Sequence, residues 1–326
     1  MIDLELVQML ADGRFHSGER LGETLGISRA AVWKRLQLLA EHGIDIERVR
    51  GRGYRLAGGV SLLDRDALIR YLGSHAQGLD IDIRLETGST NVDALYAARD
   101  GLEKPYAVLA EYQAAGRGRR GRAWVSPFAS SLYLSMAFDF ALGATELEGL
   151  SLAVGVAVAE TAVQMGVPGV ALKWPNDLLA GEHKLGGILI ELAGELDARC
   201  TAIIGVGING ALPSHVDIDQ PYTDLLRETG QRPDRNAWAA ALIVALMDMA
   251  EAFRQHGFAA FAERWQRFDA FADREVTVFQ GNTHIEGVAR GVSSRGALRV
   301  ETPEGIREFH GGEISLRGKR VAMGSA

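Results

Sequence analysis

Cysteine is almost absent from this sequence, with Cys200 as the single example in 326 residues. One cysteine cannot form a disulfide within the chain, which favours a reducing compartment. No apolar run reaches the roughly 20 residues that a membrane-spanning helix needs. The first residues, MIDLELVQML, also lack the basic charges of a signal peptide. We therefore expect a cytoplasmic protein that has no membrane partner.

The sequence also lacks a metal-binding cluster. Its eight histidines are scattered, and no Cys, His and Asp residues have the spacing of metal ligands. We expect no metal centre built from the protein's own residues. Hydrophobic residues make up 47% and charged residues 24% of the chain, as in an ordinary globular protein. The length suggests two or three domains, at roughly 100–200 residues each.

The first segment has the pattern of a helix-turn-helix followed by a hairpin. Ser17 and Ser28 are suited to cap two successive helices, and Gly26 is suited to end the first of them. Within the second helix, Val32, Leu36 and Leu39 recur at the spacing of one buried stripe. Two β-like runs around the glycines of RGRG follow, and AGGVSLL (57–63) is interpreted as a soft joint.

Basic residues gather on the second helix and on the hairpin of this segment. Residues 1–55 contain nine basic and eight acidic residues, so their balance is +1 while the whole chain is at −7. Local positive charge favours binding to DNA phosphates, with the helix in the major groove and the hairpin on the backbone. The predicted DNA-binding residues are Ser28, Arg29, Lys34, Arg35, Arg50 and Arg52. The alternative is a helical docking module whose basic face is merely solvated.

The rest of the chain divides into a large middle region and a small β-rich end. The middle region, to about residue 270, alternates strand-like runs with amphipathic or buried helices. The end, to residue 317, consists of short alternating runs separated by Gly-Asn and Pro-Glu-Gly turns, which indicates a small β-barrel or sandwich. Residues 318–326 have little to bury and are predicted to be disordered.

The stretch GRGRRGR, residues 116–122, holds four arginines and three glycines between two predicted strands. Glycine permits close backbone approach to a ligand, and arginine offers a charged fork of donors to phosphate or carboxylate. We interpret the stretch as a strap that is mobile when empty and closes over a bound anion. A solvated hairpin tip and a single-stranded nucleic-acid site are the alternatives.

Three further motifs are weak when each is considered alone. In KWPNDLL, Asn176 and Asp177 either cap a turn or point into a cleft. In HKLGGILIEL, Lys184 precedes two glycines inside a strand, where glycine often marks close approach by a ligand or by another backbone. GVGIN (205–209) is too short for a dinucleotide-binding fingerprint and opens no helix, so we reject a Rossmann site.

Taken together, these motifs closely resemble the biotin–protein ligase family, in the group that also has an N-terminal DNA-binding repressor domain. The likeness runs through TGSTN (87–91), EYQAAGRGRRGRAWVSP (111–127), KWPNDLL, KLGGILIEL, GVGIN and GGEISLR (311–317). It implies an α+β chain with a winged helix-turn-helix over 1–60 and a mixed-sheet, class II synthetase-like ligase domain over 61–270. A small SH3-like β-barrel over 271–317 and the disordered tail 318–326 complete it.

The resemblance also implies a chemistry. Biotin and ATP, the latter with Mg²⁺, form biotinyl-5′-AMP, and a lysine of a biotin carrier protein then takes the biotinyl group. Arg117, Arg119 and Lys184 are the implied catalytic residues. The implied biotin site consists of Ser89, Thr90, Asn91, Gln113, Arg117, Gly118, Arg119 and Lys184. The implied ATP and adenylate site consists of Gly116, Arg119, Arg122, Trp124, Asn176, Asp177, Asn209 and Arg317, with Trp124 expected over the adenine.

The same resemblance implies regulation by the adenylate. Bound biotinyl-AMP is expected to promote a homodimer that binds operator DNA and represses biotin biosynthesis genes. Two other hypotheses stay open at this point. One is a lipoate–protein ligase, which the intact GRGRRGR and the DNA-binding segment disfavour. The other is a ligand-sensing regulator without catalysis, which the presence of Lys184 and the whole loop disfavours.

Overall fold

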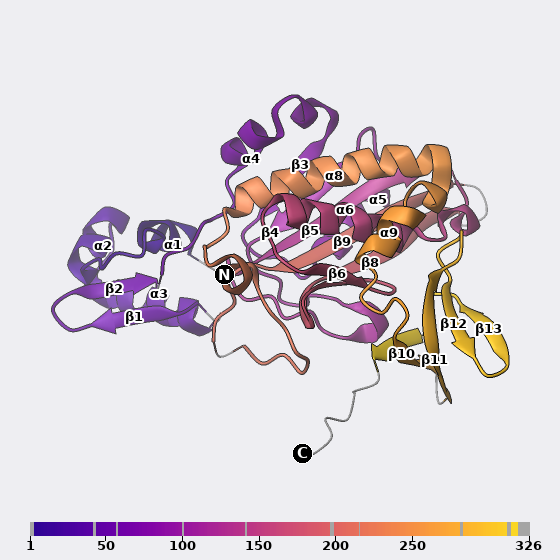
Figure 1. The fold of residues 1–326 in the computed structure, drawn as a ribbon. Coiled ribbons are helices and arrows are strands. Elements are labelled where there is room, and N and C mark those ends of the chain that lie inside the picture. Colours follow the sequence, from indigo (N-terminus) through magenta and orange to yellow (C-terminus); the bar gives the residue numbers. More distant parts are fainter. Residues whose placement is uncertain are drawn as a thin grey trace, which may run out of the picture.

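The computed structural model places three groups of elements along the chain, with the large middle group between two small ones (Figure 1). It describes residues 3–41, 44–56, 58–99, 101–140, 142–195, 199–214, 216–280, 283–311 and 314–318. At Glu41, Glu195, Arg199 and 314–318 the description covers the backbone alone. All of the predicted disordered tail except Gly318 lies outside the described residues.

The N-terminal group is a helix-turn-helix with a two-stranded hairpin, as predicted. Its elements are α1 (Leu4–Leu10), α2 (Gly18–Leu25), α3 (Arg29–Glu41), β1 (Ile46–Val49) and β2 (Gly53–Leu56). The Ser17 side chain accepts a hydrogen bond from the N–H of Arg20, and Gly26 ends α2 in the left-handed conformation. Val32, Leu36 and Leu39 are each at most 2% exposed, which confirms the buried stripe.

The segment predicted as a soft joint is instead held by hydrogen bonds in the part that the structure describes, residues 58–64, here called the linker. Val60 N–H donates to Ala11 O at 3.0 Å. The side chain of Asn236 accepts from Asp64 N–H at 2.8 Å and donates to Leu62 O at 3.0 Å. The two glycines of the segment suggested flexibility, but long-range partners, which the local sequence does not reveal, bind its backbone.

The middle group is built on a seven-stranded mixed sheet with the order β3-β4-β5-β9-β8-β7-β6. Only the pair β3–β4 is parallel. The strands are β3 (Asp80–Arg84), β4 (Tyr106–Ala110), β5 (Ser131–Phe140), β6 (Val170–Lys173), β7 (Asp177–Ala180), β8 (His183–Glu195) and β9 (Arg199–Asn209). The helices are α4 (Arg65–Leu72), α5 (Thr90–Arg99), α6 (Leu150–Gln164), α7 (Leu225–Thr229), α8 (Arg235–His256) and α9 (Ala262–Phe268).

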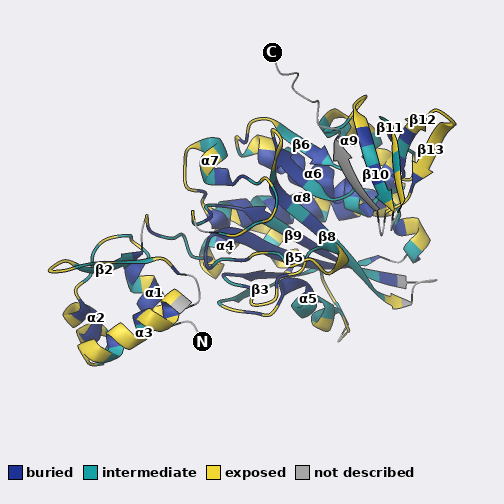
Figure 2. Ribbon diagram, turned by 90° about the horizontal axis from the view of Figure 1, so that it is seen from below, coloured by how far each residue is buried: buried dark blue, intermediate teal, exposed yellow. Residues whose placement is uncertain are grey.

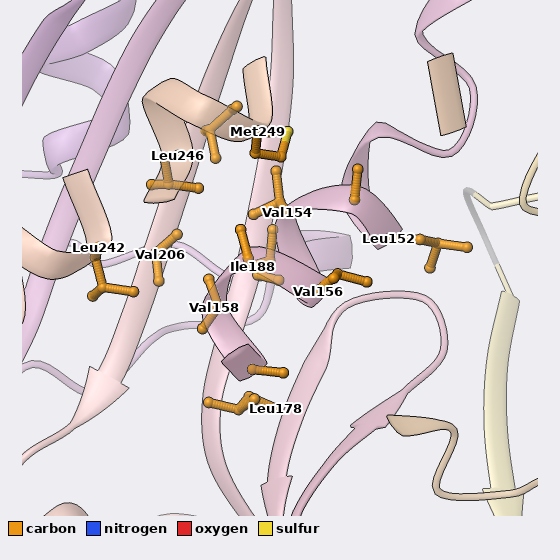
Figure 3. Packing of buried hydrophobic residues seen from close by; sticks show 14 of the residues in the cluster. Leu152, Val154, Val156, Val158, Leu178, Ile188, Val206, Leu242, Leu246 and Met249 are labelled. Carbon is orange, nitrogen blue, oxygen red and sulfur yellow. The ribbon is translucent and has the colours of Figure 1, made fainter. Parts of the chain in front are cut away.

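Helices cover the two faces of this sheet unequally. Figure 2 shows α6 and α8 on one face and the single helix α5 on the other. In the core between sheet and helices, Val154 and Val158 of α6 pack with Leu242 and Leu246 of α8 and with Val206 of β9 (Figure 3). A smaller cluster of Ala94, Val108, Ala137 and Ile203 lies under α5. The small cluster leaves part of the α5 face open for a site.

The C-terminal group is a five-stranded antiparallel sheet with the order β13-β12-β11-β10-β14. Its strands are β10 (Glu275–Gln280), β11 (Thr283–Val292), β12 (Leu298–Thr302), β13 (Gly305–Phe309) and β14 (Ile314–Gly318). Val276, Val278, Leu298 and Val300 belong to the same apolar cluster as the middle group, so the two share a core. The predicted β-rich end is confirmed as a sheet; its closure into an SH3-like barrel stays a prediction.

One helical stretch of the described residues, Arg235–Ala260, has the length and apolar content needed to cross a bilayer, with a mean hydropathy of 1.3. Within the protein, however, 56% of its most apolar window is buried. It contains α8, which packs against α4 and α6. Packing in the core therefore accounts for the apolar residues of this helix.

Candidate active site

A cavity of about 60 Å³ opens on the α5 face of the central sheet. Side chains alternate along a strand, so β5, β8 and β9 each present a different set to each face. Toward α6 and α8 they present large apolar residues such as Leu134, Ile188 and Val206. Toward α5 they present Ser135, Gly187, Gly205 and Gly207 in the middle of the sheet. These small residues leave the hollow that becomes the site.

The N-terminus of α5 forms the polar end of this cavity. Gln113 Oε1 accepts hydrogen bonds from the N–H of Thr90 at 2.9 Å and from its hydroxyl at 3.1 Å. Gln113 Nε2 donates to Ser126 Oγ at 3.0 Å, and Ser135 Oγ lies 2.8 Å from Thr90 Oγ1 and 2.6 Å from Asn91 Oδ1. These polar side chains are at most 9% exposed and are hydrogen-bonded to one another.

Strand glycines are required for this arrangement. A Cβ at Gly205 would lie 2.1 Å from Asn91 Oδ1, and one at Gly207 would lie 2.7 Å from the ring of Trp124. A Cβ at Gly187 would lie 3.1 Å from the same ring. The close approach predicted for the two glycines of HKLGGILIEL is confirmed at Gly186, where a Cβ would lie 2.7 Å from Gly207 O. At Gly187, and at Gly205 and Gly207 where no approach was predicted, the approaching groups are side chains of the site itself.

The arginine-glycine stretch is folded as a compact hairpin at the edge of the cavity. Gly118 N–H donates to Arg122 O at 2.8 Å, and Trp124 N–H donates to Gly116 O at 2.9 Å. Gly116 is buried, and a Cβ there would lie 2.4 Å from Trp124 O, so only glycine fits. At the tip, Arg120 has a φ of 60°, which is uncommon for a residue with a side chain. The motion of this loop on ligand binding stays a prediction.

Two arginines of the loop point back to the sheet. Arg117 forms an ion pair with Glu191 of β8 at 3.1 Å, and Glu191 also accepts from the Asn91 amide at 2.9 Å. Arg119 donates to Asn176 Oδ1 at 2.8 Å, and the Asn176 amide donates to Ile188 O at 2.9 Å. Burial lowers the pKa of the Arg119 guanidinium, and nearby Arg120 lowers it further while Asp177 opposes the change. The guanidinium still keeps its charge at neutral pH.

Lys184 lies between a carboxylate and an aromatic ring. Its Nζ is 2.7 Å from Asp177 Oδ1, and both side chains are less than a fifth exposed. The same Nζ lies 5.5 Å from the centroid of the Trp124 ring, within the range of a cation–π contact. Trp124 Nε1 is buried without a hydrogen-bond partner, which leaves an unsatisfied donor at the cavity.

The charges around the cavity favour an anionic ligand. Arg117, Arg119 and Lys184 line it, and Glu191 and Asp177 are paired with the first and the last of these. Three cations against two carboxylates leave an excess positive charge, and the cations are oriented by fixed partners. Such preorganised donors can stabilise a carboxylate, a phosphate or the charge that develops as one reacts with the other.

The structure brings most of the predicted site residues to one cavity. Those that line it are Ser89, Thr90, Asn91, Gln113, Arg117, Gly118, Arg119, Trp124, Asn176 and Lys184. Asp177 stands just behind Lys184, while Gly116 lies under the loop as described above. Trp124 lies against the glycines of β8 and β9 and beside Lys184. Its predicted contact with adenine is untested.

Two further predicted nucleotide-binding residues, Asn209 and Arg122, are not among the residues that line the cavity. Asn209 is buried, and its amide donates to Lys184 O at 3.3 Å and to Thr223 O at 2.9 Å, so it joins β8 to the segment before α7. Arg122 has an exposed side chain at the base of the loop. The Arg317 side chain lies outside the described part of the structure, although its backbone pairs with Thr277.

Sequence reasoning missed several residues of the site, namely Ser126, Tyr133, Ser135 and Glu191. The motif ILIEL contains Glu191 among apolar residues, and an acidic residue within an apolar strand is a signal that we could have used. Ser135 gave a similar signal in SLYLSMAF. The α5 N-terminus supplies partners to both residues, and the loop supplies Arg117 to Glu191. Only the fold brings these residues together.

The predicted DNA-binding residues occupy two surfaces of the helix-turn-helix. Ser28 caps α3 by accepting from Ala31 N–H at 3.2 Å, and Arg29 and Lys34 are exposed on α3. Arg35 is instead paired with Asp3 at 2.7 Å, so part of its charge is neutralised within the chain. On the hairpin, Arg50 is exposed, and the Arg52 guanidinium lies 4.2 Å from the centroid of the Phe15 ring.

Three protein-family models match successive parts of the chain. Residues 3–55 match an HTH domain, and residues 87–209 match the Biotin/lipoate A/B protein ligase family. Residues 272–317 match the Biotin protein ligase C terminal domain. The middle match contains the whole cavity described above, from Ser89 to Gly207.

Curated relatives match over nearly the whole chain. The Bifunctional ligase/repressor BirA of Salmonella typhimurium is 42% identical, covering 97% of this chain and 98% of the relative. The protein of the same name from Escherichia coli is 41% identical, covering 97% of each chain. Among solved structures, the Biotin protein ligase from Aquifex aeolicus in complex with biotin and ATP is 28% identical, with a TM-score of 0.64. That match covers 74% of this chain and 99% of the other.

These matches confirm the predicted fold class, with an N-terminal helix-turn-helix, a central biotin-ligase fold on a mixed sheet and a C-terminal antiparallel sheet. They also extend over both ends of the chain, so the helix-turn-helix is part of the shared architecture. The chain therefore belongs to the family of bifunctional biotin ligases and repressors.

Proposed function

We propose that this protein joins biotin to a lysine of a biotin carrier protein in two steps. In the first step the biotin carboxylate attacks the α-phosphorus of Mg-ATP, the bond to the bridging oxygen breaks, and pyrophosphate leaves. In the second step the carrier lysine attacks the acyl carbon of biotinyl-AMP, loses a proton and releases AMP. The observation that carries this proposal is the single cavity holding Gln113, Arg117, Arg119 and Lys184 in a chain related to biotin ligases over its whole length.

The two ends of the cavity suit the two parts of biotin. Ser89, Thr90, Asn91 and Gln113 offer buried hydroxyl and amide groups that match the donors and acceptors of a ureido ring. Lys184 and the loop arginines offer cations to the carboxyl end. Because the biotin carboxylate is the nucleophile in the first step and the carrier lysine in the second, the reaction needs no nucleophilic side chain from this protein. The protein contributes orientation and charge stabilisation.

Asp177 is the positioning partner of Lys184. A carboxylate 2.7 Å from Nζ holds the ammonium in place, and the ammonium then stabilises the negative charge at the reacting carboxylate and α-phosphate. Asn176 does the same for Arg119 by accepting one of its N–H groups. Mg²⁺ enters with ATP as part of the substrate, since the nearby oxygen donors Asp177 and Asn176 are already bonded to these cations.

The loop at 116–122 keeps the adenylate dry. A mixed anhydride of a carboxylate and a phosphate hydrolyses when water reaches it, so excluding water protects the intermediate until a carrier arrives. Gly121, which has a φ of 70°, and Gly116, where a Cβ would clash with Trp124 O, allow the hairpin to fold tightly. Arg117 and Arg119 connect the hairpin to the sheet. Arg122, Asn209, Arg317 and Trp124 are proposed to complete the nucleotide site when ATP binds.

The protein is also a transcriptional repressor through its helix-turn-helix. Exposed Arg29 and Lys34 on α3 and Arg50 on the hairpin supply cations to DNA phosphates. We infer that biotinyl-AMP favours a homodimer, in which two such domains read two half-sites of the operator. The same proposal includes a cytoplasmic location and domain boundaries near residues 60 and 270.

One transfer assay tests the enzymatic proposal against its nearest alternative. The protein is mixed with Mg-ATP, a biotin carrier domain and either labelled biotin or labelled lipoate. We expect label on the carrier with biotin only, together with pyrophosphate release. Transfer of lipoate in preference to biotin would indicate a lipoate–protein ligase, and absence of any transfer would indicate a regulator without catalysis.

A further inference from the structure

A buried ion pair lies where the linker, helix α8 and strand β4 meet. Arg235, the first residue of α8, donates from both terminal nitrogens to Glu111 Oε2 at 2.6 Å. The two side chains are only 3% and 4% exposed. The other carboxylate oxygen, Oε1, accepts from the N–H of Leu63 in the linker. One carboxylate thus joins the linker to α8.

A pair this deeply buried is not explained by stability alone. The free energy needed to remove two charges from water usually exceeds the free energy gained from their attraction. Proteins in which apolar residues replace such a pair are often equally stable. Here burial raises the pKa of the Glu111 carboxyl, although Arg235 and the Leu63 N–H oppose the rise. Arg235 Nε, in addition, is buried without a partner. Because burying this ion pair is unfavourable, we expect its role to be the positioning of the segments that it joins.

The same residue is connected to the biotin end of the cavity. Glu111 directly follows β4 and stands two residues before Gln113. Its carbonyl accepts from Ala129 N–H at 2.9 Å, and its N–H donates to Arg84 O at 2.9 Å. The carboxylate therefore holds a backbone segment that continues straight into the site.

A second connection runs through the far end of the active-site loop. Tyr133, which lines the cavity, donates its hydroxyl to Pro127 O at 2.8 Å. The next residues, Phe128 and Ala129, are buried in the core of the helix-turn-helix, in one cluster with Leu6 and Tyr54. The segment that closes the cavity and the N-terminal core are thus packed together.

We propose that Glu111 and Arg235 are positioning residues that couple occupancy of the biotin cavity to the linker, and so to the placement of the helix-turn-helix. The inference rests on the proposed function, because it names biotin as the ligand of the cavity. When biotin orders Gln113 and its neighbours, the segment from Glu111 to Gln113 becomes more rigid. The hydrogen bond from Leu63 to Glu111 then opens less often. By linkage, fixing the linker raises biotin affinity by the same factor.

Amide hydrogen exchange on the full-length protein tests this coupling without any substitution. Exchange is followed by mass spectrometry in peptides that contain Thr90 and Gln113, and in a peptide that contains Leu63, with and without saturating biotin. We expect protection of the cavity peptides and slower exchange at Leu63, by about fivefold or more, the lower end of typical coupling factors. Cavity protection with unchanged exchange at Leu63 would overturn the coupling and leave the proposed function intact. No protection at Thr90 and Gln113 would overturn both.

A double variant tests whether the ion pair transmits the effect. E111Q/R235M removes both charges and keeps similar volumes, so no charge is left buried alone. We expect the Leu63 peptide of this variant to exchange fast with and without biotin, while its cavity peptides are still protected at higher biotin concentrations. The matched control is E160Q/R264M, which removes the ion pair between α6 and α9. Retained biotin-dependent protection of Leu63 in E111Q/R235M would overturn the role of this pair.

Discussion

Substitution of Gly207 by alanine tests the geometry of the cavity where the Trp124 ring lies against strand β9. A Cβ at this position would lie 2.7 Å from two carbons of the Trp124 ring and 3.0 Å from its Nε1. Ordinary contacts of a Cβ are 3.4–4 Å, so the ring must move. Overpacking of this kind costs about 1–3 kcal/mol. If the displaced ring must return to its place for biotin to bind, affinity falls roughly 5- to 140-fold.

The assay is titration calorimetry of biotin into the Gly207→Ala variant, with thermal unfolding as a check on the fold. The control is Gly78→Ala, because a Cβ there meets only Met247 Cε at 3.8 Å and lies outside the cavity. We expect weak binding for the first variant and unchanged binding for the second. A folded Gly207→Ala protein whose affinity stays within about twofold of the parent would refute the placement of Trp124 as a wall of the cavity that biotin enters.

Four other substitutions give distinct expectations. Lys184→Gln removes the ammonium beside the reacting carboxylate, so the rate of pyrophosphate release should fall about 10²-fold or more. A smaller effect would mean that other residues stabilise the charge on the reacting carboxylate and phosphate. Glu191→Gln breaks a half-exposed ion pair with Arg117, which is worth about 1 kcal/mol or less. Calorimetry should therefore show at most a fivefold weaker biotin affinity. A 100-fold loss of affinity would mean that Glu191 contacts biotin directly. Lys34→Ala should lower the salt dependence of binding to random-sequence duplex DNA by about one unit of slope. Arg35→Ala should lower it less, because Asp3 already pairs with Arg35; equal slopes for the two variants would contradict that difference.

Local sequence signals predicted the elements whose ends are set by their own residues. Ser17, Gly26 and Ser28 mark helix ends in the sequence and cap the helices in the structure. The elements that we did not predict are α4, β3 and α7. Strand β3 has polar residues on both sides of its isoleucines and is stabilised by parallel pairing with β4, across a separation in sequence that no local pattern reveals.

Site residues that belong to one sequence motif could be predicted. Site residues that depend on the register between two strands could not. Arg117, Arg119 and Lys184 stand out by charge beside glycine, and all three line the cavity. Ser135 became a site residue because β5 pairs with β9 in the register that sets it opposite Gly205. A shift of one residue would turn it to the other face. The amide of Asn209 holds two backbone segments together, which its motif did not reveal, and its part in the nucleotide site stays a prediction.

The central claim is that the arginine-glycine loop retains the activated intermediate, and the release of that intermediate tests it most directly. Biotinyl-AMP labelled in the phosphate is formed on the protein, and its loss after dilution is followed by filtration. For Arg119→Ala, which gives up the hydrogen bond to Asn176, we predict a folded protein that releases or hydrolyses the label at least about tenfold faster than the parent. Equal rates of loss from the two proteins would contradict the account.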